Sequence, residues 1–143
     1  MATSVVQQVV KKLIAVLAAV TAINTPTSGR IYGAHIATIQ QPAFPAISMH
    51  VLDGARLADG AFNEVFVLQI DLWFKTVGKD AATWDDVLSV WAEVLSTLHS
   101  NSFFDSSVKI TKINNIGQGP MLHEADTNLL HYPGRFQIMA SVA

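Results

Sequence analysis

Residues 65–75 carry the sequence Val-Phe-Val-Leu-Gln-Ile-Asp-Leu-Trp-Phe-Lys, which alternates in the way a long β-strand does. Successive side chains of a strand point to opposite sides of its sheet. One side of this segment is apolar without interruption from Phe66 to Phe74, which predicts a face buried in the core. The other side mixes apolar residues with Gln69, Asp71 and Trp73. A mixed face of this kind is typical of a sheet that meets a partner, so we predict that the chain assembles.

The composition favours one domain that associates with other subunits. A length of 143 residues suits a single domain, residues 1–143, with a sizeable core. Half of the residues (50%) are hydrophobic and 14% are charged, against about 25% charged in ordinary soluble domains. Because subunit interfaces are depleted in charge, this composition indicates an oligomer.

The charge balance and the lack of cysteine exclude several classes of function. The net charge is −2 and no Lys/Arg-rich run is present, whereas proteins that hold DNA need a basic surface for the phosphates. The chain contains no cysteine, which excludes disulfides, thiolate metal sites and a cysteine nucleophile. We expect that DNA, if it passes near this protein, is not specifically bound.

The N-terminal region has the spacing of an amphipathic helix. Lys11 and Lys12 followed by the apolar residues 13–22 imitate a signal peptide, but an apolar segment, Val5–Val10, precedes the charges. The run is too short to span a bilayer, and its apolar residues recur at helical spacing. We predict a packed helix that extends to about Ala22–Asn24 and is stopped by Thr25-Pro26.

The alternation over Ala46–Val51 predicts a second strand, joined to the strand at 65–75 by a turn-rich loop. That loop, Asp53–Gly60, contains two glycines and two aspartates and is longer than a tight hairpin requires. Two alternatives remain open, a mobile loop and a loop that protrudes to contact a partner.

A second helix should follow Thr83, which forms a capping box with Asp86. Its apolar residues follow helical spacing and predict a buried stripe. The members of this stripe are Trp84, Val87, Leu88, Trp91, Leu95 and Leu98.

Two further strands are expected after this helix. The first begins at Val108 and reverses its alternation near Thr111–Lys112, which predicts a β-bulge. A polar connection, Gly117–Leu130, leads to the last strand, Arg135 to Val142. The predicted fold is α+β, a two-layer sandwich in the order α-β-β-α-β-β, with two helices on one face of a largely antiparallel sheet.

No catalytic or metal-binding pattern stands out. The five histidines lack the spacing of a His-Glu-x-x-His zinc site, and the possible ligands His123, Glu124 and Asp126 are better explained as a solvated loop. His50 is interpreted as a surface or interface histidine, and Asp71 as a half-buried interface acid. We therefore predict that the protein is not an enzyme and uses no cofactor or metal.

Five short motifs, in order along the chain, resemble the small tail-completion (tail-terminator) proteins of tailed bacteriophages. They are Gly29-Arg30-Ile31-Tyr32, Pro45-Ala46-Ile47-Ser48, Asp71-Leu72-Trp73-Phe74-Lys75, Leu95-Ser96-Thr97-Leu98-His99 and Gly134-Arg135-Phe136. The resemblance implies a homohexameric ring at the head-proximal end of the tail, assembled in the host cytoplasm. Its implied partners are the tail tube protein and a head-connector or stopper protein, with DNA passing through the lumen.

The polar residues of the mixed strand face and of the two loops are the candidates for a subunit or partner interface. They are Asp53, Arg56, Asp59, Gln69, Asp71, Trp73, His123, Glu124 and Asp126. We also hypothesise that Asp53, Asp59 and Glu64 keep the lumen or a ring face non-basic.

Three other readings stay open. The nearest is another head–tail ring component, such as a stopper or tube protein. A small α+β ligand-binding or enzymatic domain would need a pocket with convergent polar groups. A membrane-anchored protein would rest only on residues 11–22.

Overall fold

The computed structural model describes residues 5–33, 43–56, 63–76, 82–99, 103–104, 108–119, 122–123 and 129–142. The elements, in chain order, are α1 (Val5–Ala18), α2 (Thr21–Thr27), β1 (Ile31–Tyr32), β2 (Ala46–Arg56), β3 (Asn63–Lys75), α3 (Trp84–His99), β4 (Phe103–Phe104), β5 (Val108–Gln118), β6 (Leu122–His123) and β7 (Leu129–Val142).

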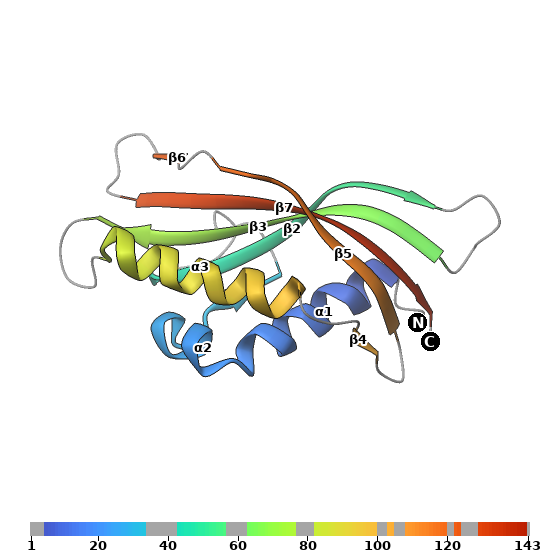
Figure 1. Cartoon of the computed structure of the whole chain (residues 1–143), viewed down its shortest axis with the longest axis horizontal. Helices are drawn as coiled ribbons and strands as arrows, with labels where there is room; N and C mark the ends of the chain where they lie inside the picture. Colours follow the sequence, from blue (N-terminus) through green and yellow to red (C-terminus); the bar gives the residue numbers. More distant parts are fainter. Residues whose placement is uncertain are drawn as a thin grey trace.

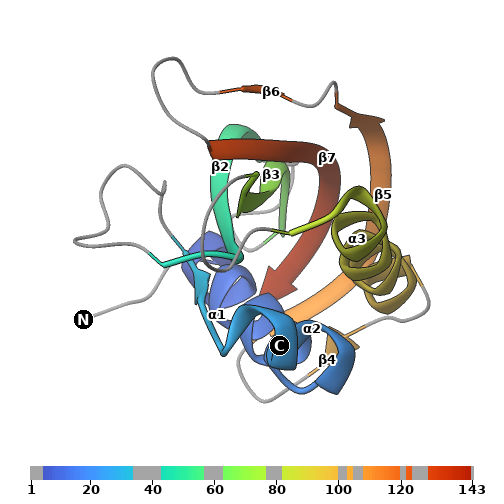
Figure 2. The same ribbon diagram turned by 90° about the vertical axis from the view of Figure 1, so that its left-hand side faces the viewer.

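The described strands form one seven-stranded sheet in the order β1-β2-β3-β7-β5-β4, with β6 beside β7. Only β1 and β2 run parallel, and every other pair is antiparallel. The helices lie on one side of this sheet, which curves over them (Figures 1 and 2). The predicted α+β two-layer fold is therefore confirmed.

The strand at 65–75 is the centre of this architecture. It is part of β3, which pairs with β2 on one side from Glu64 to Trp73 and with β7 on the other side over its whole length. The predicted apolar face, Phe66 to Phe74, is buried against the helices, with no member more than 3% exposed. Burying a side chain of this size contributes about 1.5–3 kcal/mol, so this row is a main stabiliser of the core.

The single N-terminal helix predicted to end at about Ala22–Asn24 is wrong: the chain forms two helices, α1 and α2, bent by 92° at Ala19–Val20. The buried row of α1 ends at Leu17. If the helix continued straight, the next residues to face the core would be Thr21 and Asn24. The bend instead buries Ile23, an apolar side chain, at that place. Pro26 lies inside α2 rather than ending the helix, and Ser28 closes it in the left-handed conformation.

The predicted loop Asp53–Gly60 is shorter than expected. β2 continues through Asp53 to Arg56, where Arg56 pairs with Glu64 of β3, so only residues 57–62 connect the two strands. The glycines and aspartates that predicted the loop are partly accommodated within β2, which has a bulge between Val51 and Asp53. The resulting β2–β3 hairpin ends at one extremity of the molecule (Figure 1).

The predicted capping box at the start of α3 is present. The Asp86 amide donates to Thr83 Oγ1 at 3.2 Å, and the Thr83 amide donates to Asp86 Oδ2 at 3.1 Å. The predicted stripe is partly wrong, because Trp84 and Leu88 are 56% and 44% exposed. The buried row contains Val90 and Val94 instead, and this rotation of the helix places the Trp91 indole over the sheet.

The capping box makes the stability of the fold depend on pH in the acidic range. Hydrogen bonds from the Thr83 backbone amide and then its hydroxyl lower the pKa of Asp86 below its ordinary value of 3.8. The ionised carboxylate therefore stabilises the fold above pH 3.8, and this contribution is lost as the pH falls through the lower, folded-state pKa. We expect Asp86→Ala to lower the urea midpoint at pH 7, with a smaller difference from wild type below pH 3.8. Asp85→Ala is the control, and an Asp86→Ala midpoint equal to that of wild type at pH 7 would contradict the prediction.

The bulge predicted near Thr111–Lys112 is confirmed by the register shift between Ile110 and Lys112. A second shift, between Asn115 and Gly117, was not predicted. β5 continues to Gln118, so the connection expected from Gly117 is shorter at its beginning.

The last strand begins at Leu129, well before the predicted Arg135. Pro133 made an earlier start unexpected, since proline has no N–H for a central strand. Its carbonyl accepts from the Gly119 amide at 2.8 Å, and the nitrogen of a strand residue faces the same neighbour as its carbonyl. The Pro133 nitrogen therefore faces the gap between the end of β5 and the start of β6. Neither of these strands pairs with β7 at this position, so the missing N–H costs no ladder hydrogen bond.

Candidate functional site

A cluster of polar and aromatic side chains lies on the helix-free face of the sheet, across β2, β3 and β7. We call it the outer-face cluster. Its members are Ser48, His50, Gln69, Asp71, Trp73 and His131. The strand register brings them together, because Ser48 pairs with Asp71, His50 with Gln69, and Trp73 with His131.

Asp71 is the centre of the outer-face cluster and is only 1% exposed. Gln69 Nε2 donates to its two carboxylate oxygens at 3.0 and 3.1 Å. His131 Nδ1 lies 3.2 Å from Asp71 Oδ1, within hydrogen-bond distance. His50 Nδ1 is farther away, 3.9 Å from Asp71 Oδ2. Burial of the carboxylate is thus compensated by donors from the neighbouring strand positions.

Trp73 joins the outer-face cluster to an apolar one. Its ring stacks on His131 with centroids 4.2 Å apart, and its Nε1 donates to Ser48 Oγ at 2.8 Å. The indole also packs with Phe44 and Ala46 in a small core that is separate from the main one. These contacts fasten β2, β3 and β7 to each other on the side that no described helix covers.

The chemistry of the outer-face cluster is that of a structural network. The Asp71 carboxylate is held by Gln69 and His131, and the Ser48 hydroxyl accepts a bond from an indole that is no base. Within the described ranges, no three histidine or carboxylate side chains are grouped to hold a metal ion. We assign the cluster the role of cross-strand fastening.

The sequence interpretation of Asp71 as half-buried is wrong, because its side chain and that of Trp73 are buried within the chain itself. Gln69 and His50 are partly exposed and are the members through which a neighbour could touch the cluster. His131 was missed, since the last strand was expected to begin after Pro133. The pairing of residue 131 with Trp73 would have revealed it, and pairing is a property of the fold.

The other predicted interface residues lie in the two loops and at the strand ends next to them. Asp53 and Arg56 lie in β2, beyond its bulge, and His123 lies in β6. Asp59, Glu124 and Asp126 lie outside the described residues. The predicted contact of these residues with a partner stays a prediction.

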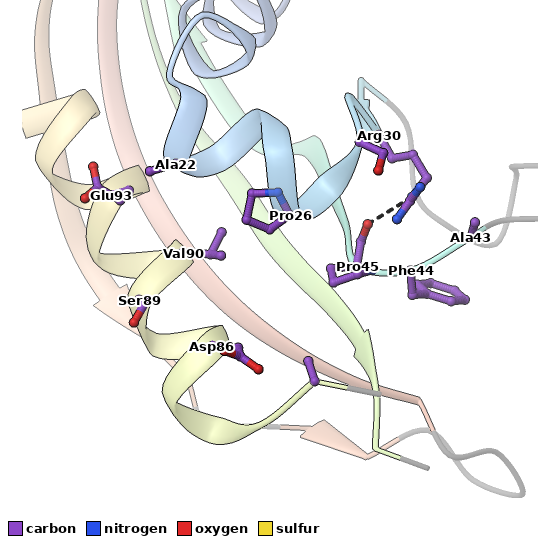
Figure 3. A pocket seen from close by; sticks show the side chains of 12 residues that line it. Ala22, Pro26, Arg30, Ala43, Phe44, Pro45, Asp86, Ser89, Val90 and Glu93 are labelled. Atoms are coloured by element: carbon purple, nitrogen blue, oxygen red, sulfur yellow. Dashed lines mark hydrogen bonds between the residues drawn. The ribbon is translucent and has the colours of Figure 1, made fainter. Parts of the chain in front are cut away.

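An open groove of about 550 Å³ lies between α2, α3 and the start of β2 (Figure 3). Pro26, Val90 and Phe44 give it an apolar lining, with Asp86 and Glu93 on the α3 side. On the opposite side Arg30 Nε donates to the Pro45 carbonyl at 3.0 Å. The charged groups stand on separate walls and do not converge on a point, so the groove lacks the arrangement of an acid–base site.

A smaller apolar pocket of about 260 Å³ lies where the C-terminal half of α3 meets β5. Its lining residues are Leu95, Leu98, His99, Ile113, Asn115 and Phe136. Among the described helices, no single one is long and apolar enough to cross a membrane; α1 and α2 pass such a test only as a bent pair.

No protein-family model and no curated protein matches the sequence. Among solved structures, the fold is similar to that of a chain from the structure described as "Virion of native gene transfer agent (GTA) particle", with a TM-score of 0.74. The match covers 98% of this chain and 99% of that chain, at 13% sequence identity. At this identity the likeness shows a common fold over the whole length of both chains.

Proposed function

We propose that this protein is a structural component of a phage-like virion, a tail terminator that forms a ring on the tail tube and joins it to the head connector. The observation that carries the proposal is the fold likeness to a virion chain, which covers both chains almost completely. The order of the sequence motifs that resemble tail-terminator proteins supports the same role independently.

The described site chemistry supports an assembly role over catalysis. The polar residues that catalysis would require are used in the outer-face cluster to hold strands together. The groove between α2 and α3 and the pocket beside β5 are open surface features that a partner chain could occupy. In this role the protein has other virion proteins as partners: copies of itself, the tail tube protein and a connector or stopper protein.

The terminator proposal is tested by assembly with tail tubes. The purified protein should form rings, measured as a discrete multiple of the 15.5 kDa subunit mass, and electron micrographs should show these rings at one end of co-expressed tail tubes. Tubes made with the protein should have a capped end and a defined length. A monomer that neither forms rings nor binds tube ends would refute the proposal.

A stopper or tube protein is the second candidate, because these also form rings in the same part of a virion. A tube protein would polymerise into long tubes by itself, and a stopper would bind the connector and leave tube ends free. The position of the gene between those of the connector and the tube would favour the terminator.

We expect DNA to pass through the ring without being retained. The net charge is −2, and contact with 6–10 phosphates would make affinity fall by about 10³–10⁵ between 50 and 200 mM salt. Fluorescence anisotropy with a labelled duplex should therefore show little binding even at 50 mM salt. Tight binding that weakens steeply with salt would contradict this prediction and the hypothesis that Asp53, Asp59 and Glu64 keep the lumen non-basic.

A further inference from the structure

Among the described residues, the sheet has two edges that are mostly without a neighbouring strand. β1 covers β2 only at Ile47 and Ser48, and β4 covers β5 only at Lys109 and Ile110. Over the rest of each edge, residues 49–56 of β2 and 111–118 of β5, the described part of the chain supplies no neighbouring strand. A sheet edge of this length can accept a strand from another chain.

Each edge carries a bulge that presents an exposed aliphatic side chain, and β5 carries a second bulge, at Thr111. Leu52 is the extra residue between Val51 and Asp53, and it is 43% exposed. Ile116 is the extra residue between Asn115 and Gly117, and it is 53% exposed.

The bulges at Leu52 and Ile116 lie on opposite edges of the sheet, at nearly the same height, measured along the strand direction. Val51 pairs with Leu68, Leu68 with Phe136, and Phe136 with Asn115, so these four residues form one row across β2, β3, β7 and β5. Leu52 directly follows one end of the row, and Ile116 directly follows the other. Their difference in height is about one residue, or roughly 3.4 Å.

This arrangement fits a second copy of the same chain. Since each neighbouring pair in the row is antiparallel, β2 runs antiparallel to β5. An antiparallel ladder, interrupted at the bulges, can therefore form between β2 of one copy and β5 of the next. Contact at nearly equal height requires a rotation with little translation along the strands. A heterologous contact of this kind can close into a ring, whereas a large translation would produce an open filament.

The apolar pocket beside β5 supplies a place for one more side chain. Asn115 and Phe136, which line it, belong to the same row as Val51. Val51 ends this row on β2, follows the inward-facing Ile47 and Met49, and is 40% exposed. A copy that joins at equal height brings its Val51 toward the mouth of this pocket.

We propose that copies of this chain join through the β2 edge of one and the β5 edge of the next, burying Leu52 and Ile116 in the contact and directing Val51 to the pocket beside β5. The inference deepens the proposed function, since it rests on the ring and assigns the surfaces that close it.

Charged substitutions test the two edges separately. Leu52→Lys and Ile116→Lys should each reduce the assembly seen for wild type to monomers, measured by sedimentation velocity. Leu88→Lys is the matched control, because Leu88 is a similarly exposed leucine (44%) on α3, away from both edges, and this variant should assemble like wild type. Circular dichroism verifies that the three variants are folded. A mixture of the Leu52→Lys and Ile116→Lys variants should form dimers and nothing larger, since each pair retains one intact contact.

Cross-linking tests the contact directly, because the chain has no cysteine of its own. The double variant Leu52→Cys/Ile116→Cys with a short bis-maleimide should give a ladder of linked subunits that ends at the ring size. Neither single variant should give a ladder. The control pair Leu88→Cys/Met139→Cys should give none either.

The outcomes separate the interface from the proposed function. Wild-type rings that persist in the Leu52→Lys and Ile116→Lys variants would overturn the interface and leave the terminator proposal standing. Rings that depend on both residues but ignore tail tubes would overturn the terminator proposal and leave the interface standing. A wild type that stays monomeric at all concentrations would overturn the interface.

Discussion

Replacing His131 with phenylalanine is expected to lower the free energy of unfolding by about 3 kcal/mol, because it leaves the Asp71 carboxylate buried with one donor fewer. Phenylalanine preserves an aromatic ring against Trp73, which stacks on His131 at 4.2 Å, so the loss reports the hydrogen bond to Asp71. Urea unfolding at pH 7 measures it.

Two further variants make the His131 prediction specific. His50→Phe should cost less, since its Nδ1 is 3.9 Å from the carboxylate, and His99→Phe, at an exposed position, should change stability little. Asp71→Asn combined with His131→Phe should be less destabilising than the sum of the single changes, because no buried charge then remains. An unchanged urea midpoint in His131→Phe would show that Asp71 does not depend on this histidine.

Replacing Gly134 with alanine is expected to lower the free energy of unfolding by about 1–3 kcal/mol, the usual cost of overpacking a core. A Cβ at this position would overlap the six-membered ring of the Trp91 indole, which packs directly on the strand backbone. Thermal unfolding followed by tryptophan fluorescence measures the loss.

Two further variants, at Gly117 in β5 and at Trp91 in α3, test whether the cost at Gly134 comes from the contact with the indole. Gly117→Ala is the control, because a Cβ there would meet no atom within 4 Å, and its stability should stay close to wild type. Trp91→Leu removes the obstructing ring, so Gly134→Ala should cost less in that background, with a coupling of about 0.5–3 kcal/mol. Equal costs in the two backgrounds would place the strain elsewhere.

The sequence predicted well the features that depend on a local pattern of side chains. The uninterrupted apolar face of β3 predicted a central strand, and the Thr83–Asp86 pair predicted the start of α3, because both signals depend on residues close in sequence. The bulge at Thr111 was also predictable, since a one-residue slip reverses the alternation of the strand.

The wrong predictions concern features of helices and strands that depend on contacts with residues far away in the sequence. The bend between α1 and α2 depends on which side chain the core accepts after Leu17, and the early start of β7 depends on an interval between β5 and β6 beside Pro133. The α3 stripe was misplaced at Trp84 and Leu88 for the same reason: the helix rotates to fit Trp91 over Gly134, a residue that lies far away in the sequence.

For this protein, the sequence by itself determined an α+β fold built around the strand at 65–75, with no motif for catalysis. The tertiary structure alone decided what the mixed face of that strand does. Asp71 and Trp73 turn to His131 and Ser48 within the chain, while the exposed aliphatic residues appear at the bulges of the two open edges. The physical reason is that burial along one strand follows from its own alternation, whereas the partners of a polar side chain and the height of an edge residue follow from the register between strands.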